Sequence, residues 1–258
     1  MSGVAVQVSG SIGERRSLVR WPSHERRSLQ FNGDDVCLRQ ATSDDAGKLA
    51  AAGWILTEAD RREVAAIGHS ELKRRAVVSR VLLREMLSER HGNRISPSEW
   101  AFERTPEGKL VLAPGLPQTH FSISYSGRDI VIAVSRTRKI GVDVESERVR
   151  VDEVCLRPYL TRRERLALAQ TPPEQRQLAV LRLWTLKEAY LKLRGIGLAA
   201  DLSTIEFGFD PVRLCAAWEP ADRGAKTQFA VWTKSGDSGP LHISLAVSPS
   251  GANDQRSG

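Results

Sequence analysis

The sequence predicts an α+β protein built from two similar halves. Alternating apolar and polar residues predict strands in both halves, and apolar residues at helical spacing predict helices between them. The order strand, helices, strands occurs twice, over residues 34–137 and 138–248. A chain of 258 residues is long enough to bury a core in each half. We expect a pseudo-twofold arrangement of the halves with a cleft between them.

The two ends of the chain carry no such pattern. Residues 1–33 are rich in Ser, Gly and Arg, and we expect them to form a disordered extension. Residues 249–258 predict a frayed tail. The N-terminus lacks a basic start followed by an apolar run, and no apolar run is long enough to span a bilayer. We therefore expect neither export of the protein nor its insertion into a membrane.

Charge and cysteine content narrow the function classes. The net charge of +7 predicts attraction to polyanions, which include nucleic acids, acidic proteins and phosphorylated small molecules. The cysteines, Cys37, Cys155 and Cys215, are far apart and indicate neither a disulfide framework nor a zinc site. We therefore expect a cytoplasmic protein.

In the first half, a strand is expected at 36–40 and two helices between residues 56 and 87, divided near Gly68. Thr57 followed by Asp60 resembles a helix cap. Residues 100–112 predict two short strands joined at the turn TPEG. The stretch FSISYSGRDIVIAVSR, residues 121–136, predicts a hairpin that turns at Gly127 and Arg128.

The second half begins with IGVDVE, residues 140–145, in which apolar residues alternate with Gly141, Asp143 and Glu145. A capped helix is expected from Thr161 to about Gln170, and a longer helix over 174–193 that ends at Gly195. Strands are expected at 204–209, 228–234 and 241–247.

Three carboxylates are the candidates for chemistry. As a strand, IGVDVE points Asp143 and Glu145 to one side. On the long helix, Glu188 lies four residues after Trp184 and four before Lys192, so these three share a face, and Lys187 lies beside them. Carboxylate oxygens suit Mg²⁺, and lysines balance phosphate charge. An exposed strand edge and a structural Glu188–Lys192 ion pair explain the same residues.

Three motifs together resemble the 4′-phosphopantetheinyl transferases of the surfactin-synthetase (Sfp) type. They are FSISYSGR at 121–128, IGVDVE at 140–145 and WTLKEAYLK at 184–192, in this order and at these separations. The resemblance covers about residues 55–247. It implies two similar α+β halves in one chain, for which a monomer is the natural expectation.

The resemblance also implies an activity, which is transfer of the phosphopantetheine arm of coenzyme A to a serine of an acyl or peptidyl carrier protein. By resemblance, Asp143, Glu145 and Glu188 would ligate Mg²⁺, and Lys187 and Lys192 would stabilise phosphate charge. Coenzyme A would be bound by four further residues as well as by Lys192, and these are Arg75, Lys109, Ser124 and Tyr125. Glu188 would take the proton of the carrier serine.

Two positions depart from the family pattern. Tyr125 stands where the family usually has a histidine, and Leu110 stands where a proline follows glycine and lysine. A neutral hydroxyl at 125 in place of a titrating ring predicts a change in coenzyme A affinity and in its pH dependence.

Two other functions remain open from the sequence. One is a relative that docks carrier proteins without catalysis. The other is a nucleic-acid-binding protein, which the basic charge favours. The sequence contains no recognised nucleic-acid-binding motif, however, and we do not expect nucleic acid as a partner. Coenzyme A binding separates the transferase from the nucleic-acid-binding protein, and turnover separates it from the docking relative.

Overall fold

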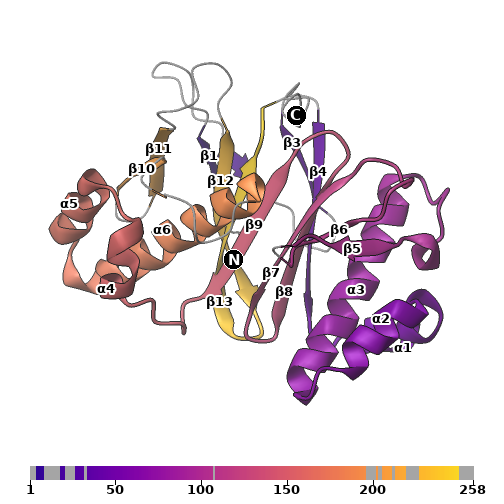
Figure 1. The fold of residues 1–258 in the computed structure, drawn as a ribbon. Helices are drawn as coiled ribbons and strands as arrows, with labels where there is room; N and C mark the ends of the chain where they lie inside the picture. Colours follow the sequence, from indigo (N-terminus) through magenta and orange to yellow (C-terminus); the bar gives the residue numbers. More distant parts are fainter. Residues whose placement is uncertain are drawn as a thin grey trace. The chain divides into compact units, whose positions relative to one another are not determined.

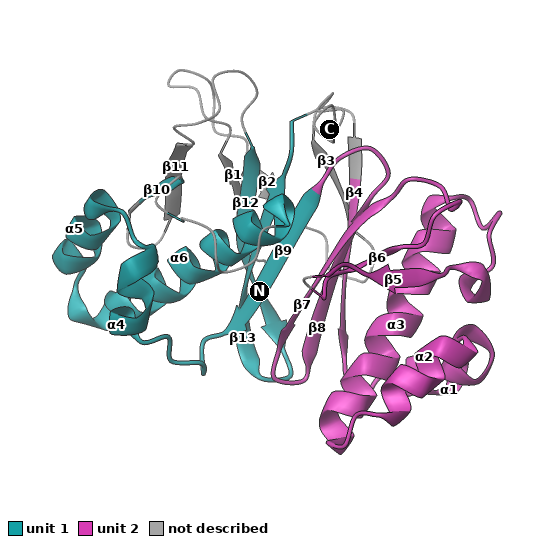
Figure 2. Ribbon diagram, in the orientation of Figure 1, with its two compact units in different colours: residues 1–24, 140–258 teal, residues 25–139 magenta. Residues whose placement is uncertain are grey.

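The computed structural model describes residues 4–8, 18–20, 27–31, 34–106, 108–195, 202, 205–210, 213–218 and 227–249 (Figure 1). The chain forms two compact units (Figure 2). Unit 1 comprises residues 1–24 and 140–258, and unit 2 comprises residues 25–139. The predicted halves meet between residues 137 and 138, and the units divide between Lys139 and Ile140.

Unit 2 packs helices on one face of an antiparallel sheet with the strand order β3-β4-β8-β7. Its elements are β3 (Arg27–Phe31), β4 (Asp34–Thr42), α1 (Ala46–Ile55), α2 (Glu58–Ala65), α3 (Ser70–Arg90), the 3-10 helix η1 (Pro97–Glu99), β5 (Phe102–Arg104), β6 (Leu110–Leu112), β7 (His120–Ser126) and β8 (Asp129–Ser135). Strands β5 and β6 form a separate hairpin.

The core of unit 2 lies between α3 and β8. Val78, Leu82 and Met86 of α3 belong to one buried cluster with Ile130 and Ile132 of β8. Alternation along β8 puts Ile130 and Ile132 on the same face of the sheet, which is the face that α3 covers. The predicted hairpin β7–β8 is present and turns at Gly127 and Arg128.

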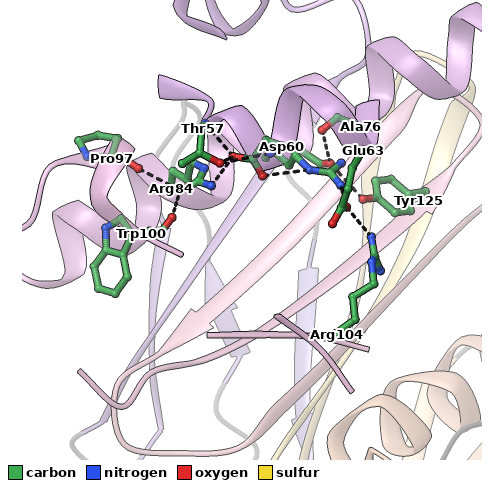
Figure 3. A network of polar contacts seen from close by, with 11 residues as sticks. Thr57, Asp60, Glu63, Ala76, Arg84, Pro97, Trp100, Arg104 and Tyr125 are labelled. Carbon is green, nitrogen blue, oxygen red and sulfur yellow. Dashed lines mark hydrogen bonds and ion pairs between the residues drawn. The ribbon is translucent and has the colours of Figure 1, made fainter. Parts of the chain in front are cut away.

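Helix α3 is held against α2 by a buried ion pair, shown in Figure 3. Asp60 is the third residue of α2 and forms the capping box with Thr57 that the sequence predicts. The same carboxylate pairs with the buried guanidinium of Arg84, which also donates to the carbonyl oxygens of Pro97 and Trp100. Burial lowers the pKa of Arg84, and Asp60 opposes that shift. This network fixes the helix that carries Arg75.

Unit 1 contains an antiparallel sheet with the strand order β2-β1-β12-β13-β9 and the long helix α6. Its elements are β1 (Val4–Val8), β2 (Leu18–Arg20), β9 (Ile140–Ser146), α4 (Glu153–Leu156), the 3-10 helix η2 (Arg157–Tyr159), α5 (Arg162–Gln170), α6 (Pro173–Arg194), β10 (Glu206–Asp210), β11 (Arg213–Trp218), β12 (Gln228–Gly236) and β13 (Gly239–Val247). Strands β10 and β11 pair with each other.

Helix α6 begins and ends where its sequence predicts. Prolines at positions 172 and 173 open it, because a proline at the first helical position lacks only an N–H that the helix does not use. Gly195 ends it in the left-handed conformation, with φ of 68°. Its apolar side chains join those of β10 and β12 in one core, which includes Phe207 and Phe229. The α+β class predicted from the sequence is confirmed, while the pseudo-twofold arrangement stays a prediction.

Several elements are absent from the sequence prediction. Helix α1 and strand β11 were not foreseen, nor were the short strands β1, β2 and β3 inside the segment expected to be a disordered extension. The remainder of residues 1–33, and residues 250–258 of the expected tail, lie outside the described residues. Among the helices that the structure describes, none has the length and apolar character needed to cross a membrane.

Candidate functional site

Helix α6 lies directly on the face of β9 that carries the motif carboxylates. Gly141, Asp143 and Glu145 share this face because side chains alternate along a strand. A Cβ atom added to Gly141 would lie 2.0 Å from the carbonyl oxygen of Ala189 and 2.4 Å from the backbone nitrogen of Leu193. Only glycine allows this approach. The contact brings Glu188 and Lys192, the neighbours of Ala189 and Leu193, over β9.

Asp143 and Lys192 form an ion pair at this contact. The ammonium Nζ of Lys192 lies 2.7 Å from Oδ1 of Asp143. The side chain of Asp143 is 7% exposed and that of Lys192 is 30% exposed. The carboxylate is thus held inside the unit, while the lysine stem reaches toward solvent.

Glu188 is the third member of this cluster. Burial raises the pKa of Glu188, the charge of nearby Asp143 raises it further, and Lys192 opposes the shift. Its Oε1 is buried and accepts no hydrogen bond from any residue that the structure describes. A buried carboxylate without a donor is costly. If both acids are ionised, the two carboxylates and one ammonium carry a net charge of −1, which a proton or a cation would neutralise.

Glu145 lies further along the strand. It is two residues beyond Asp143, a distance of about 7 Å along a strand, and directly opposite His242 of β13. Within the described ranges, no three His, Cys, Asp or Glu side chains gather closely enough to hold a metal ion together. The structure therefore brings Asp143 and Glu188 together but does not assemble the predicted set of three carboxylates.

A polar seam continues from this cluster beneath α6. Thr185 Oγ1 lies 2.8 Å from Oγ of Ser244, which is opposite Asp143 in the sheet. Arg182 donates to Nδ1 of His242 at 3.4 Å, and Nε2 of His242 lies 2.7 Å from Glu147. An arginine can only donate, so this contact makes Nδ1 the acceptor and Nε2 the donor. Burial lowers the pKa of His242.

Sequence reasoning missed this seam. The alternation of His242, Ser244 and Ala246 in β13 was its signal, since it puts two polar side chains on one face of a buried strand.

Lys187 lies elsewhere, which corrects the expectation that it stabilises phosphate charge. Its Nζ is 2.9 Å from Glu164 Oε1, and both side chains are fully buried. The ammonium also donates to the carbonyl oxygens of Leu202 and Ile205, at 3.1 and 2.7 Å. Lys187 follows Leu186 on a helix that is buried on several sides, and it faces α5 and the chain before β10. We do not carry Lys187 into the proposed mechanism.

In unit 2 the structure brings Arg75 and Tyr125 together. The guanidinium carbon of Arg75 lies 4.5 Å from the centroid of the Tyr125 ring. Arg75 also donates to the carbonyl oxygen of Gly127 at 3.3 Å. The hydroxyl of Tyr125 points at α3 and donates to Ser79 Oγ at 3.1 Å (Figure 3).

Ser124 and Lys109 are not part of this pair. Ser124 is buried and, by alternation along β7, points to the opposite face from Tyr125. Lys109 precedes β6, and part of the residue is exposed. Desolvation of its ammonium, followed by repulsion from Lys139, lowers the pKa of Lys109. Both remain predictions as coenzyme A ligands.

The fold and the cluster together define a class, namely an α+β protein with an acidic pair and a lysine on facing elements. Residues 139–245 match the family model of the 4′-phosphopantetheinyl transferase superfamily. These residues include β9, α6 and most of β13, so the match falls on the elements that carry the cluster. The resemblance that the sequence motifs predicted is confirmed over this part of the chain.

Individual relatives agree with the family match. The chain is 35% identical over 144 residues to the 4′-phosphopantetheinyl transferase HetI of a Nostoc species, covering 55% of this chain and 60% of HetI. It is 30% identical over 136 residues to the transferase Sfp of Bacillus subtilis, covering 53% and 58%. A phosphopantetheinyl transferase of a Thraustochytrium species is 30% identical over 193 residues, covering 64% and 66%. The matches thus span less than two thirds of each relative.

Proposed function

We propose that the protein transfers the 4′-phosphopantetheine moiety of coenzyme A to a serine of an acyl or peptidyl carrier protein. The observation that carries this proposal is Glu188, a partly buried glutamate whose buried Oε1 accepts no hydrogen bond from the described residues, set beside Asp143 and Lys192. Such a group needs a proton or a cation. In a phosphoryl-transfer site, a carboxylate can accept a proton as general base and can also bind a metal ion. The names of the relatives support the same reaction class.

The donor set suits Mg²⁺. Its ligands are oxygens, and the net negative charge of the cluster favours a cation. Asp143 and Glu188 would hold the ion, and Glu145, two residues further along β9, is proposed as the third ligand on the sequence resemblance. When bound, Mg²⁺ would neutralise charge on the pyrophosphate of coenzyme A and so stabilise the transition state.

Glu188 is the proposed general base. A raised pKa brings a carboxylate nearer to neutral pH, where it accepts a proton more readily than an ordinary glutamate does. It would take the proton of the carrier serine as that hydroxyl attacks the β-phosphorus of coenzyme A. The new bond joins the serine oxygen to phosphorus, and the bond to the bridging oxygen breaks to release adenosine 3′,5′-bisphosphate. Lys192, which is partly exposed beside Asp143, would stabilise the charge on the phosphate oxygens.

In unit 2, Arg75 and Tyr125 are proposed contacts of coenzyme A on the sequence resemblance. Arg75 supplies a guanidinium for phosphate, and Tyr125 lies against it. Lys109 and Ser124 are proposed as further contacts on the sequence resemblance alone.

The carrier protein is proposed to bind a basic and partly apolar surface of unit 1. Around α4 and α5, Val154 and Leu166 are 72% and 53% exposed. Exposed arginines outnumber the exposed acids Glu147, Asp152 and Glu153 in the same stretch of the chain, and they are Arg148, Arg150, Arg157, Arg162, Arg163 and Arg165. An acidic carrier with an apolar contact patch would fit this surface. We further propose that the protein acts as a monomer in the cytoplasm.

The test is intact-mass spectrometry of an apo carrier protein incubated with this protein, coenzyme A and Mg²⁺. The proposal expects a mass gain of one phosphopantetheine, about 340 Da, that a chelator abolishes. A panel of fatty-acid, polyketide and peptide-synthetase carriers would show which is served. Coenzyme A binding without transfer to any carrier would favour a docking relative instead, and absence of coenzyme A binding would refute the proposal.

A further inference from the structure

Tyr125 lies at the end of the α3 face of β7, opposite Ile130 of β8. Two residues of α3, Arg75 and Ser79, contact it, and they are four positions apart on one side of that helix. Arg75 covers the ring, whereas Ser79 meets the hydroxyl. Tyr125 is thus held at both its apolar and its polar parts.

The hydroxyl of Tyr125 is committed to the interior of the unit. Ser79 Oγ donates its hydrogen to the carbonyl oxygen of Ala76 at 3.1 Å, so it accepts from Tyr125 at 3.1 Å. A phenol has a single hydrogen to donate. Toward a ligand it therefore presents only lone pairs, which repel the anionic oxygens of a phosphate.

Arg75, in contrast, keeps donors to spare. One of its five N–H groups donates to Gly127, and no carboxylate of the described residues lies within ion-pair distance of it. The two nearby carboxylates form their ion pairs with other residues. Asp44 pairs with Arg74 and Arg128, and Glu71 pairs with Arg74 and accepts from Ser43. Arg74 and Arg128 thus occupy both carboxylates, and no ion pair among the described residues neutralises the charge of Arg75.

We propose that Tyr125 is a positioning residue, whose ring holds the Arg75 guanidinium ready for a phosphate monoester while its hydroxyl makes no contact with that phosphate. The aromatic face and the Gly127 carbonyl fix the guanidinium from two directions, so little side-chain freedom is lost when an anion binds. This inference rests on the proposed function, because it takes coenzyme A as the source of the phosphate.

The test compares the dissociation constants of coenzyme A and 3′-dephospho-coenzyme A by isothermal titration calorimetry. Tyr125→Phe keeps the ring, and we expect its affinity for coenzyme A to stay within about twofold of the wild type. Tyr125→Leu removes the ring, and we expect about fivefold weaker binding of coenzyme A, with little change for the dephospho form. Arg75→Leu should weaken the binding of coenzyme A at least about tenfold. Arg62→Leu, which removes an exposed arginine of α2 that pairs with Glu58, is the matched control and should change the affinity for neither ligand.

The double variant Arg75→Leu/Tyr125→Leu decides whether the ring acts through the arginine. Binding no weaker than that of Arg75→Leu alone would support the proposal. Additive losses, or a Tyr125→Phe loss as large as that of Tyr125→Leu, would overturn it. Thermal melting of each variant checks that it folds. Arg75→Lys keeps the charge but loses the planar stack on the ring. We expect this variant to lose its preference for coenzyme A over 3′-dephospho-coenzyme A even though its core is intact. A wild-type protein that binds neither ligand would refute the proposed function itself.

Discussion

Replacing Gly141 by alanine tests the packing that builds the candidate site. The added Cβ would lie 2.0 Å from Ala189 O and 2.4 Å from Leu193 N, whereas carbon atoms in contact prefer about 3.5–4.0 Å. Both obstacles are backbone atoms of α6, so the whole helix must move away from β9. Overpacking a core costs about 1–3 kcal/mol, and we expect the upper end here because no side chain can rotate away.

Such a loss is readily measured. About 3 kcal/mol corresponds to a fall of about 6–12 °C in the melting temperature of a protein of this size. The movement of α6 would also separate Glu188 from Asp143, so divalent-cation binding measured by calorimetry should weaken together with stability. Gly53→Ala is the matched control, since nothing lies within 4 Å of its Cβ position in the last turn of α1. Alanine there should be neutral or stabilising. A Gly141→Ala protein that melts within 1 °C of the wild type, by the scale just given, would refute the reasoning.

Three further predictions address charge. Burial lowers the pKa of both His91 and His242 below the ordinary value of 6.5, so the unfolded chain takes up protons first and the free energy of unfolding should fall as pH drops from 7 to 5; a flat profile in urea titrations would contradict this. Lys187→Met leaves Glu164 buried without its cation and should cost about 3–5 kcal/mol, part of which Glu164→Gln in the same chain should restore; equal stability of the single variant and the wild type would show that the pair is not buried as described. Raising the salt concentration should weaken carrier binding, because exposed charges are screened beyond about 8–10 Å, and salt-independent affinity would argue against the basic surface of α4 and α5.

Much of the fold follows from local pattern. The capping boxes at Thr57 and Thr161 are both present, and α6 ends at Gly195 as its glycine indicates. These signals succeed because each depends on a few neighbouring residues. Helix α1 escaped notice because its alanines and glycines give little contrast between faces, with Trp54 70% exposed beside buried Ala51. Strand β1 pairs with the distant β12, and such long-range pairing leaves no local sign. Strand β3 pairs with its neighbour β4, for which the Asn-Gly sequence at 32–33 was a local signal that the prediction overlooked.

The candidate site was predictable only in part. Strand alternation and the four-residue helical spacing brought out Asp143, Glu188 and Lys192, and the structure joins them. The placement of Lys187 could not be read in this way, because a helix buried on several sides has no polar face that tells which neighbour each residue meets. Nor does the sequence state that Gly141 is the contact point of α6, since a glycine in a strand fits a bulge equally well.

Glu188 is the residue on which the account depends most, and its replacement by glutamine is the most direct test. Intact-mass spectrometry would follow the rate at which an apo carrier gains phosphopantetheine, with calorimetry of coenzyme A binding in parallel. The account predicts a loss of at least about 100-fold in transfer, as expected when a general base is removed, with coenzyme A still bound. The control is Glu174→Gln, an exposed glutamate in the first turn of the same helix, which should transfer at the wild-type rate. Wild-type turnover by the Glu188→Gln protein would show that this carboxylate is neither the base nor an essential ligand, and the proposed site would be wrong.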